Sequence, residues 1–176
     1  MGLFDQKTAL VIADMIVDFV DRSGKLYVPG IEEIVPEISS LIDQAHEAGA
    51  PVIFVNDAHD PDDIEFRQWG EHALAGSTGA QVVPDLGPSE EDHVLKKKKY
   101  TVFYETGLQD LLEKMLIGRV VITGTVTNIC VMVSAIEALM MGFKVTVPKR
   151  AVKGLNEADH NFALDQLERV FGAQVV

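Results

Sequence analysis

The sequence predicts a three-layer α/β/α sandwich built on a mainly parallel sheet. Short apolar runs of strand length alternate with longer segments of helical periodicity, and no tight hairpin turn joins one run to the next. The runs are also apolar without alternation, which is typical of parallel strands covered by helices on both faces. At 176 residues the chain suits one domain, 1–176, with a sizeable core.

The first half of the chain supplies two strands and one helix to this pattern. A strand over 8–13 ends at Asp14, a helix over 31–48 is closed by Gly49, and a strand over 52–55 is followed by Asn56-Asp57-Ala58-His59. Acids at the carboxyl ends of parallel strands lie where α/β folds build their sites, although Asp14 could equally cap the next turn.

A segment of about thirty residues after the second strand lacks any periodicity. Segments this long without regular structure are usually functional in compact domains. This one contains carboxylates and imidazoles that suit Zn²⁺, Mn²⁺ or Fe²⁺, namely Asp57, His59, Glu65 and His72. The alternative is a solvated acidic loop with incidental histidines.

The second half repeats the alternation of strands and helices. We expect strands at 93–99, 120–123, 144–148 and 174–176, and helices at 108–115, after Thr127, and after an Asn156 cap. The first of these strands carries four consecutive lysines, 96–99. Because alternate strand residues face opposite sides, at most two of the four can face one crevice.

Cys130 is the only cysteine, and the pattern places it in the first turn of the helix that follows strand 120–123. The partial positive charge of a helix N-terminus lowers a thiol's pKa, which makes Cys130 a candidate nucleophile; an inert buried thiol is the alternative. In a parallel sheet, Asp14, the Asp57/His59 pair, one lysine and Cys130 would converge at a single edge.

Composition limits the partners. The net charge of −12 and pI near 4.7 oppose binding to nucleic acid or an anionic membrane. The single cysteine, the absence of a long apolar run and the absence of a signal-like N-terminus lead us to expect a cytoplasmic protein. Met140 and Met141, near a helix end, are interpreted as core residues, with the interface of a homo-oligomer as the alternative.

Three fragments resemble the isochorismatase-like cysteine hydrolases, in particular the nicotinamidase/pyrazinamidase branch. These are Asp14 with Asp18-Phe19, a K-x-x-Y-x-x-F pattern at Lys97, Tyr100 and Phe103, and a G-x-x-T-x-x-C pattern at Gly124, Thr127 and Cys130. Their order and spacing together are specific, and the resemblance covers nearly the whole chain. One departure is that Ile16 and Val17 stand where relatives usually have polar residues.

The resemblance also implies a metal site and an oxyanion hole. The fragments Asp57-Ala58-His59 and Trp69-Gly70-Glu71-His72 imply Asp57, His59 and His72 as ligands, with Glu65 binding directly or through water, to a divalent metal: Zn²⁺ first, Fe²⁺ or Mn²⁺ as alternatives. A cis Thr125–Val126 peptide would direct the Val126 N–H, beside that of Cys130, into an oxyanion hole.

The implied activity is hydrolysis of nicotinamide to nicotinate and ammonia through a thioester. Asp14 would be the base, Lys97 the stabilising cation and Cys130 the nucleophile, while Phe19 and Trp69 would be walls for the ring of a small carboxamide substrate. N-carbamoyl or ureido-type amidohydrolases share this constellation and remain an alternative, as does another hydrolase of the family. A catalytically silent binding module of the same fold is the non-enzyme alternative.

Overall fold

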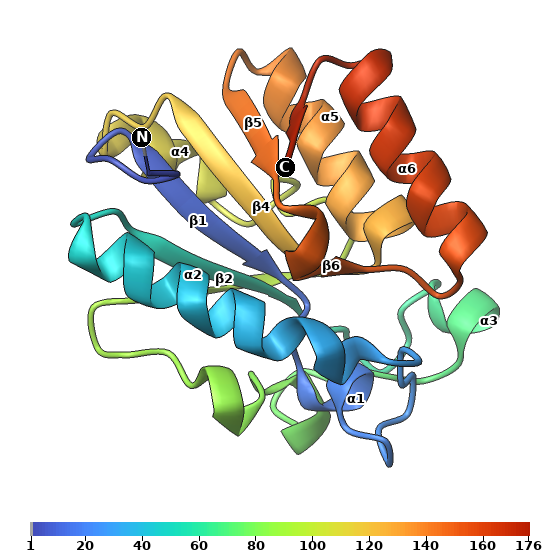
Figure 1. The fold of residues 1–176 in the computed structure, drawn as a ribbon. Helices are drawn as coiled ribbons and strands as arrows, with labels where there is room; N and C mark the ends of the chain where they lie inside the picture. Colours follow the sequence, from blue (N-terminus) through green and yellow to red (C-terminus); the bar gives the residue numbers. More distant parts are fainter. Residues whose placement is uncertain (1) are drawn as a thin grey trace.

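A computed structural model describes residues 2–176 and has a seven-stranded sheet at its centre (Figure 1). The strand order is β3-β2-β1-β4-β5-β7, β6 pairs with β4, and every pairing is parallel. The predicted parallel sheet is therefore confirmed. The strands are β1 (Thr8–Ala13), β2 (Val52–Asp57), β3 (His93–Lys97), β4 (Arg119–Thr125), β5 (Lys144–Val147), β6 (Val152–Lys153) and β7 (Gln174–Val175).

Helices cover both faces of this sheet. The α-helices are α1 (Val17–Val20), α2 (Val35–Glu47), α3 (Phe66–Trp69), α4 (Leu108–Lys114), α5 (Met132–Met140) and α6 (Glu157–Arg169). Figure 1 shows α5 and α6 side by side, well away from α2. Shorter helical turns are η1 (Ile31–Ile34), η2 (Thr78–Ala80), η3 (Pro84–Leu86), η4 (Thr127–Val131) and η5 (Lys149–Ala151).

Two hydrophobic cores explain the three layers. Ala9, Val11 and Ala13 of β1 point into the core beneath α4, α5 and α6, whereas Leu10 and Ile12 point into the core beneath α2. Because successive side chains of a strand face opposite sides, an uninterrupted apolar run can fill both cores. The three-layer sandwich is thus the arrangement that buries both faces of each central strand.

Several boundaries differ from the sequence-based expectation. The predicted helix over 31–48 begins as the 3₁₀ turn η1, and α2 starts at Val35, so Pro36 lies in its first turn, where a missing N–H costs no helical hydrogen bond. Strand β3 ends at Lys97 rather than at residue 99, and β6 was not predicted. The long segment after β2 contains α3, η2 and η3.

The carboxyl ends of β1, β2, β3 and β4 lie at the same edge of the sheet, with α1 and α3 beyond it (Figure 1). The register sets Asp57 of β2 beside Lys97 of β3 and Ala13 of β1 beside Gly124 of β4. Gly124 has φ +103°, and a Cβ at this position would overlap the carbonyl of Ala13. The first residue of the G-x-x-T-x-x-C pattern is therefore required by the close approach of β4 to β1.

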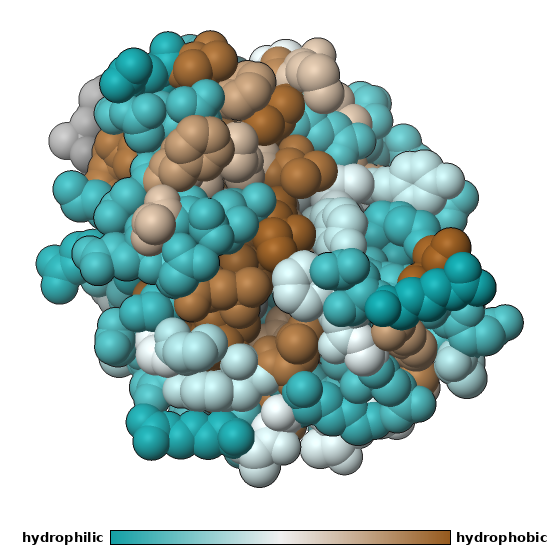
Figure 2. Space-filling model, turned by 90° about the vertical axis from the view of Figure 1, so that its right-hand side faces the viewer, coloured by the Kyte–Doolittle hydropathy of each residue, from teal (hydrophilic) through white to brown (hydrophobic). Residues whose placement is uncertain are grey.

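Hydrophobic residues form a band down the middle of the face that carries α6 (Figure 2). Large exposed apolar side chains on α5 and α6 include Val133, Met140 and Phe162. Met140 is 76% exposed, so the prediction that it packs in the core is wrong.

Over residues 2–176, the helices are too short or too polar to cross a bilayer.

Candidate active site

Three buried side chains meet at the carboxyl edge of the sheet: Asp14 directly follows β1, Lys97 ends β3, and Cys130 lies in the turn η4 after β4. The Nζ atom of Lys97 lies 2.9 Å from Asp14 Oδ2 and 3.6 Å from Cys130 Sγ. It also lies 2.5 Å from Asp57 Oδ1. Asp14 is fully buried, and Lys97 and Cys130 are 1% and 6% exposed. Lys96, Lys98 and Lys99 are exposed, so only Lys97 of the four consecutive lysines enters this site.

The main chain at the end of β1 turns to aim the Asp14 carboxylate. Asp14 has φ +58°, a left-handed conformation that aspartate tolerates better than most residues. Its Oδ1 accepts a hydrogen bond of 2.8 Å from the N–H of Asp57. Among the described residues, Oδ2 makes the ion pair with Lys97 but no well-directed hydrogen bond, which leaves this oxygen available to take a proton.

Burial dominates the protonation of this group. Burial and the neighbouring Asp57 carboxylate raise the pKa of Asp14 to about 7. Burial also raises the pKa of the Cys130 thiol well above its usual value, and Lys97 only partly opposes that effect. The lowering of the thiol pKa expected from the helix terminus is therefore outweighed by burial. The Asp14 carboxylate lies in the same cluster and can accept the thiol proton.

Cys130 lies in a π-helical turn, η4, between β4 and α5 rather than in a regular first α-helical turn. Such turns are frequent at functional sites. The Val126 carbonyl accepts hydrogen bonds from Ile129 N and Val131 N, at 3.0 and 3.2 Å. The peptide bond between Thr125 and Val126 is cis. Buried Ser134 joins this turn to the chain after β3, because its hydroxyl donates to Cys130 O and accepts from Val102 N.

A second polar cluster lies beside the first and consists of Asp57, His59, Glu65 and His72. One potential ligand atom from each residue falls within 4.8 Å of the others. Asp57 belongs to both clusters, since its Oδ1 contacts Lys97 and its Oδ2 lies 3.6 Å from His59 Nε2. Two imidazoles with two carboxylates form a donor set suited to zinc, iron or manganese.

The hydrogen bonds of the two histidines fit a metal site. His59 Nδ1 lies 3.1 Å from Asp63 Oδ2, and His72 Nδ1 lies 2.8 Å from the Gly70 carbonyl, so each Nδ1 has an outer partner of the kind that orients metal ligands. His59 Nε2 is buried and has no hydrogen-bond partner within residues 2–176. An unpaired buried nitrogen facing two carboxylates is what a divalent cation would satisfy.

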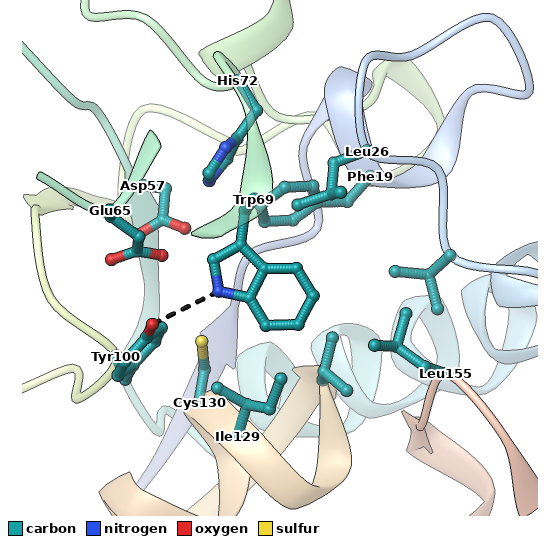
Figure 3. A pocket seen from close by; sticks show the side chains of 12 residues that line it. Phe19, Leu26, Asp57, Glu65, Trp69, His72, Tyr100, Ile129, Cys130 and Leu155 are labelled. Atoms are coloured by element: carbon teal, nitrogen blue, oxygen red, sulfur yellow. Dashed lines mark hydrogen bonds between the residues drawn. The ribbon is translucent and has the colours of Figure 1, made fainter. Parts of the chain in front are cut away.

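A pocket lined by residues of both clusters opens beside Cys130 (Figure 3). In Figure 3, Cys130, Asp57, Glu65 and His72 lie on one side, and Leu26 and Leu155 on the other. Trp69 lies between these groups, and its indole N–H donates to the Tyr100 hydroxyl at 3.3 Å. The twelve lining residues are Phe19, Leu26, Val28, Asp57, Glu65, Trp69, His72, Tyr100, Val126, Ile129, Cys130 and Leu155.

The structure thus brings together all the residues proposed from the sequence: the Asp14, Lys97 and Cys130 group, the potential metal ligands, and the Phe19 and Trp69 walls. Sequence reasoning assigned no role to Leu26, Val28, Ile129 or Leu155, because lone aliphatic residues in turns carry no recognisable signal. Tyr100 belongs to the K-x-x-Y-x-x-F pattern, but the pattern did not predict that its side chain lines the pocket.

Asp18 is another residue whose role was missed. It is 7% exposed, and its carboxylate accepts hydrogen bonds from Ala73 N at 2.7 Å and Lys25 N at 3.2 Å. A Cβ at Gly79 would overlap this carboxylate. Asp18 therefore fastens the segment after β2, which contains His72, to the loop after β1.

A fold of this kind, with an acid, a lysine and a cysteine at the carboxyl edge of a parallel sheet, defines a class of α/β proteins with a cysteine-centred site. The family model described as "Isochorismatase domain" matches residues 8–176. The chain belongs to the isochorismatase family, which confirms the resemblance noted in the sequence.

Solved structures with similar folds carry more than one activity in their names. N-carbamoylsarcosine amidase from Thermoplasma acidophilum is 36% identical with a TM-score of 0.89, covering 96% of this chain and 95% of that one. Pyrazinamidase/nicotinamidase from Streptococcus mutans is 29% identical with a TM-score of 0.91, covering 96% and 99%. Pyrazinamidase of Pyrococcus horikoshii, in complex with zinc, is 30% identical with a TM-score of 0.91, covering 97% and 98%.

Proposed function

We propose that this protein is a metal-binding cysteine amidohydrolase that converts nicotinamide and water to nicotinate and ammonia. One observation carries the proposal: Cys130, which lies beside the buried Asp14 and Lys97, lines a pocket with aromatic and aliphatic walls, and three of the four potential metal ligands line the same pocket. Such a pocket suits a flat, uncharged ring that bears a carboxamide.

Acyl transfer to the thiol is the first half of the reaction. The Asp14 carboxylate takes the Cys130 proton, and the thiolate attacks the carboxamide carbon while Lys97 stabilises the negative charge. The N–H groups of Val126 and Cys130 hold the developing oxyanion, and each such donor contributes about 3–4 kcal/mol in comparable sites. The C–N bond then breaks, the Asp14 proton goes to the leaving nitrogen, and ammonia departs from a thioester.

Hydrolysis of the thioester is the second half. A water molecule gives a proton to Asp14 and attacks the acyl carbon, the C–S bond breaks, and the proton returns to the Cys130 sulfur. The pKa of about 7 for Asp14 suits a group that accepts and returns a proton near neutral pH. A divalent cation held by Asp57, His59, His72 and Glu65 would supply a Lewis-acid position for the ring nitrogen.

The pocket lining favours nicotinamide over N-carbamoyl amino acids. N-carbamoylsarcosine carries a carboxylate, and a buried carboxylate needs a cation or several hydrogen-bond donors. The twelve lining side chains include no lysine or arginine, and the Lys97 ammonium below them is already paired with Asp14 and Asp57. The proposal of a neutral amide rests on this lining and requires that the metal position be taken by the ring nitrogen rather than by a substrate carboxylate. Sequence identity alone does not separate the two activities.

Ammonia release tests the proposal directly. Purified protein of known metal content is incubated with nicotinamide, with benzamide, which lacks the ring nitrogen, and with N-carbamoylsarcosine; the Cys130→Ala variant is the control. We expect cysteine-dependent release from nicotinamide, weaker release from benzamide, and none from N-carbamoylsarcosine. Preferential turnover of N-carbamoylsarcosine would overturn the substrate assignment, and release of ammonia from none of the three amides would overturn the nicotinamidase proposal in favour of another hydrolase of the family or a binding module.

A further inference from the structure

Two threonine hydroxyls tie the chain around Val126 to the C-terminal segment of the protein. The Thr125 hydroxyl donates to the Lys153 carbonyl at 3.2 Å. A hydrogen bond of 2.8 Å joins Thr127 Oγ1 to His160 Nδ1. Both threonines are fully buried. The residues on either side of Val126 are therefore each held by a side-chain hydrogen bond to β6 or α6, the elements that follow η5.

His160 is itself held firmly in place. Asn156 caps α6 by accepting a hydrogen bond of 2.9 Å from Asp159 N, and the His160 N–H donates to the Asn156 carbonyl. The chain at Gly154 passes so close to His160 that a Cβ at Gly154 would lie 2.9 Å from the His160 Cβ. Gly154 thus permits the contact that sets the imidazole against Thr127.

We propose that His160 is a positioning residue which, through Thr127, holds the Val126 N–H in the direction required of an oxyanion donor. The inference rests on the proposed function, since it assigns a role in the same reaction. His160 does not line the substrate pocket. It acts on the reaction only through the turn that presents Cys130.

The geometry explains why one hydroxyl can matter so much. The Val126 carbonyl accepts from Ile129 N and Val131 N, which fixes the peptide unit between Val126 and Thr127. The Val126 N–H belongs to the preceding unit, between Thr125 and Val126, so its direction can change by rotation about the bonds on either side of that unit while the carbonyl bonds persist. The hydroxyl bonds of Thr125 and Thr127 oppose that rotation from both sides.

The expected kinetic signature differs from that of a merely structural contact. An oxyanion donor interacts with charge that exists only in the transition state, so misplacing it lowers kcat and leaves KM nearly unchanged. Removal of one such donor costs about 10²–10³ in kcat, and a misdirected donor should cost about 10- to 100-fold.

The variants Thr127→Val and His160→Phe remove the hydrogen bond while keeping side chains of similar shape, and His160→Asn keeps a polar group near the position of Nδ1. Thr123→Val and His46→Phe are matched controls: buried Thr123 bonds to the Val11 carbonyl of β1, and His46 pairs with Asp92 at the surface. We expect a 10- to 100-fold fall in kcat for the first two variants, with KM changed less than about threefold, and recovery of most of the rate in His160→Asn.

The double variant tests whether the two residues act as one unit. Because Thr127 and His160 share one hydrogen bond, the combined loss in kcat should equal about one single loss rather than the product of two. Losses in kcat no larger than those of the controls, losses that appear in KM, or multiplicative losses would each overturn the proposal.

An NMR measurement tests the hydrogen bond without any substrate. The ¹⁵N order parameter of the Val126 amide should resemble rigid backbone, about 0.85, in the parent protein and should fall toward about 0.6 in Thr127→Val and His160→Phe, but not in the controls. If the parent protein hydrolyses no amide, the proposed function fails and this measurement still decides whether His160 orders Val126. An unchanged order parameter, or a lowered one without the loss in kcat in an active enzyme, overturns the inference.

Discussion

The two sides of the active site are built in different ways. Asp14, Lys97 and Cys130 come from the ends of β1 and β3 and the turn after β4, and each is at most 6% exposed. Trp69, Glu65 and Tyr100 come from the segments after β2 and β3 and are partly or largely exposed. The reactive group thus lies directly at the carboxyl ends of the strands, whereas most of the pocket wall is carried by longer connecting segments.

This difference separates chemistry from recognition. Side chains on the ends of packed strands are held to small tolerances, as acyl transfer requires, whereas loops can change without disturbing the cores. Relatives with the same fold but different named activities fit this division. Changes on the strand side should therefore abolish the reaction, and changes on the loop side should alter binding.

Loss of the nucleophile should have the largest effect. Cys130→Ala should lower kcat more than about 10⁴-fold because no thioester can form, while the thermal unfolding curve changes little. Asp14→Asn should give a similar loss, since an amide cannot accept the thiol proton. Residual turnover above about 1% in either variant, measured by ammonia release, would contradict the assigned pair of nucleophile and base.

Replacement of Lys97 should damage both the reaction and the fold. Lys97→Met leaves the Asp14 and Asp57 carboxylates buried without their cation, and breaking a buried ion pair from one side costs about 3–5 kcal/mol of stability. Urea unfolding measures this loss. The neighbouring Lys96→Met is the matched control, because Lys96 is exposed, and it should change the free energy of unfolding by less than about 0.5 kcal/mol. Equal effects at the two positions would show that the wrong lysine has been assigned.

Loss of a metal ligand should be the next largest effect and should appear first in metal content. His59→Ala removes a buried imidazole from the cluster, so metal that co-purifies with the parent protein should fall at least about tenfold, as elemental analysis would show. His46→Ala, which removes a surface histidine far from the cluster, should retain the parent's content. If the parent protein holds no metal after purification and reconstitution, the assignment of this cluster as a metal site is wrong.

Removal of a pocket wall should have the smallest of these effects. Trp69→Ala should raise KM about tenfold through lost contact with the substrate ring, with kcat changed little, because Trp69 touches neither Cys130 nor Lys97 through a hydrogen bond. The control Phe162→Ala truncates an aromatic side chain that is 59% exposed on α6. A large fall in kcat for Trp69→Ala would erase the distinction between the two sides of the site.

The fold could be predicted from the sequence because its signals are local and repeated. The apolar run of β1 is enough to predict a buried strand, and Asn156 is enough to predict the start of α6. In the structure Asn156 does accept a hydrogen bond from Asp159 N. The 3₁₀ start at η1 and the end of β3 at Lys97 depend on tertiary packing, and residues 31–34 and 96–99 carry no such information.

The site could be predicted less completely, for a physical reason. Residues that react or bind metals are chemically conspicuous, so Asp14, Lys97, Cys130 and the Asp57 cluster could be proposed from the sequence alone. Residues that act by position, such as Asp18, Ser134 and His160, are ordinary polar residues until their partners are known. The direction of the thiol pKa was also missed, because burial outweighs the helix terminus and burial cannot be read from a cysteine's neighbours in sequence.

The four consecutive lysines give the sheet edge a form of redundancy. A slip of one residue in the pairing of β3 with β2 would exchange the buried and exposed faces of the strand, but it would still set a lysine, 96 or 98, opposite Asp57. In the observed register, the partly buried Leu95 packs against the core, and Lys98 pairs with Asp60 at 2.6 Å. Pairing errors at this strand would therefore change packing while leaving a positive charge opposite Asp57.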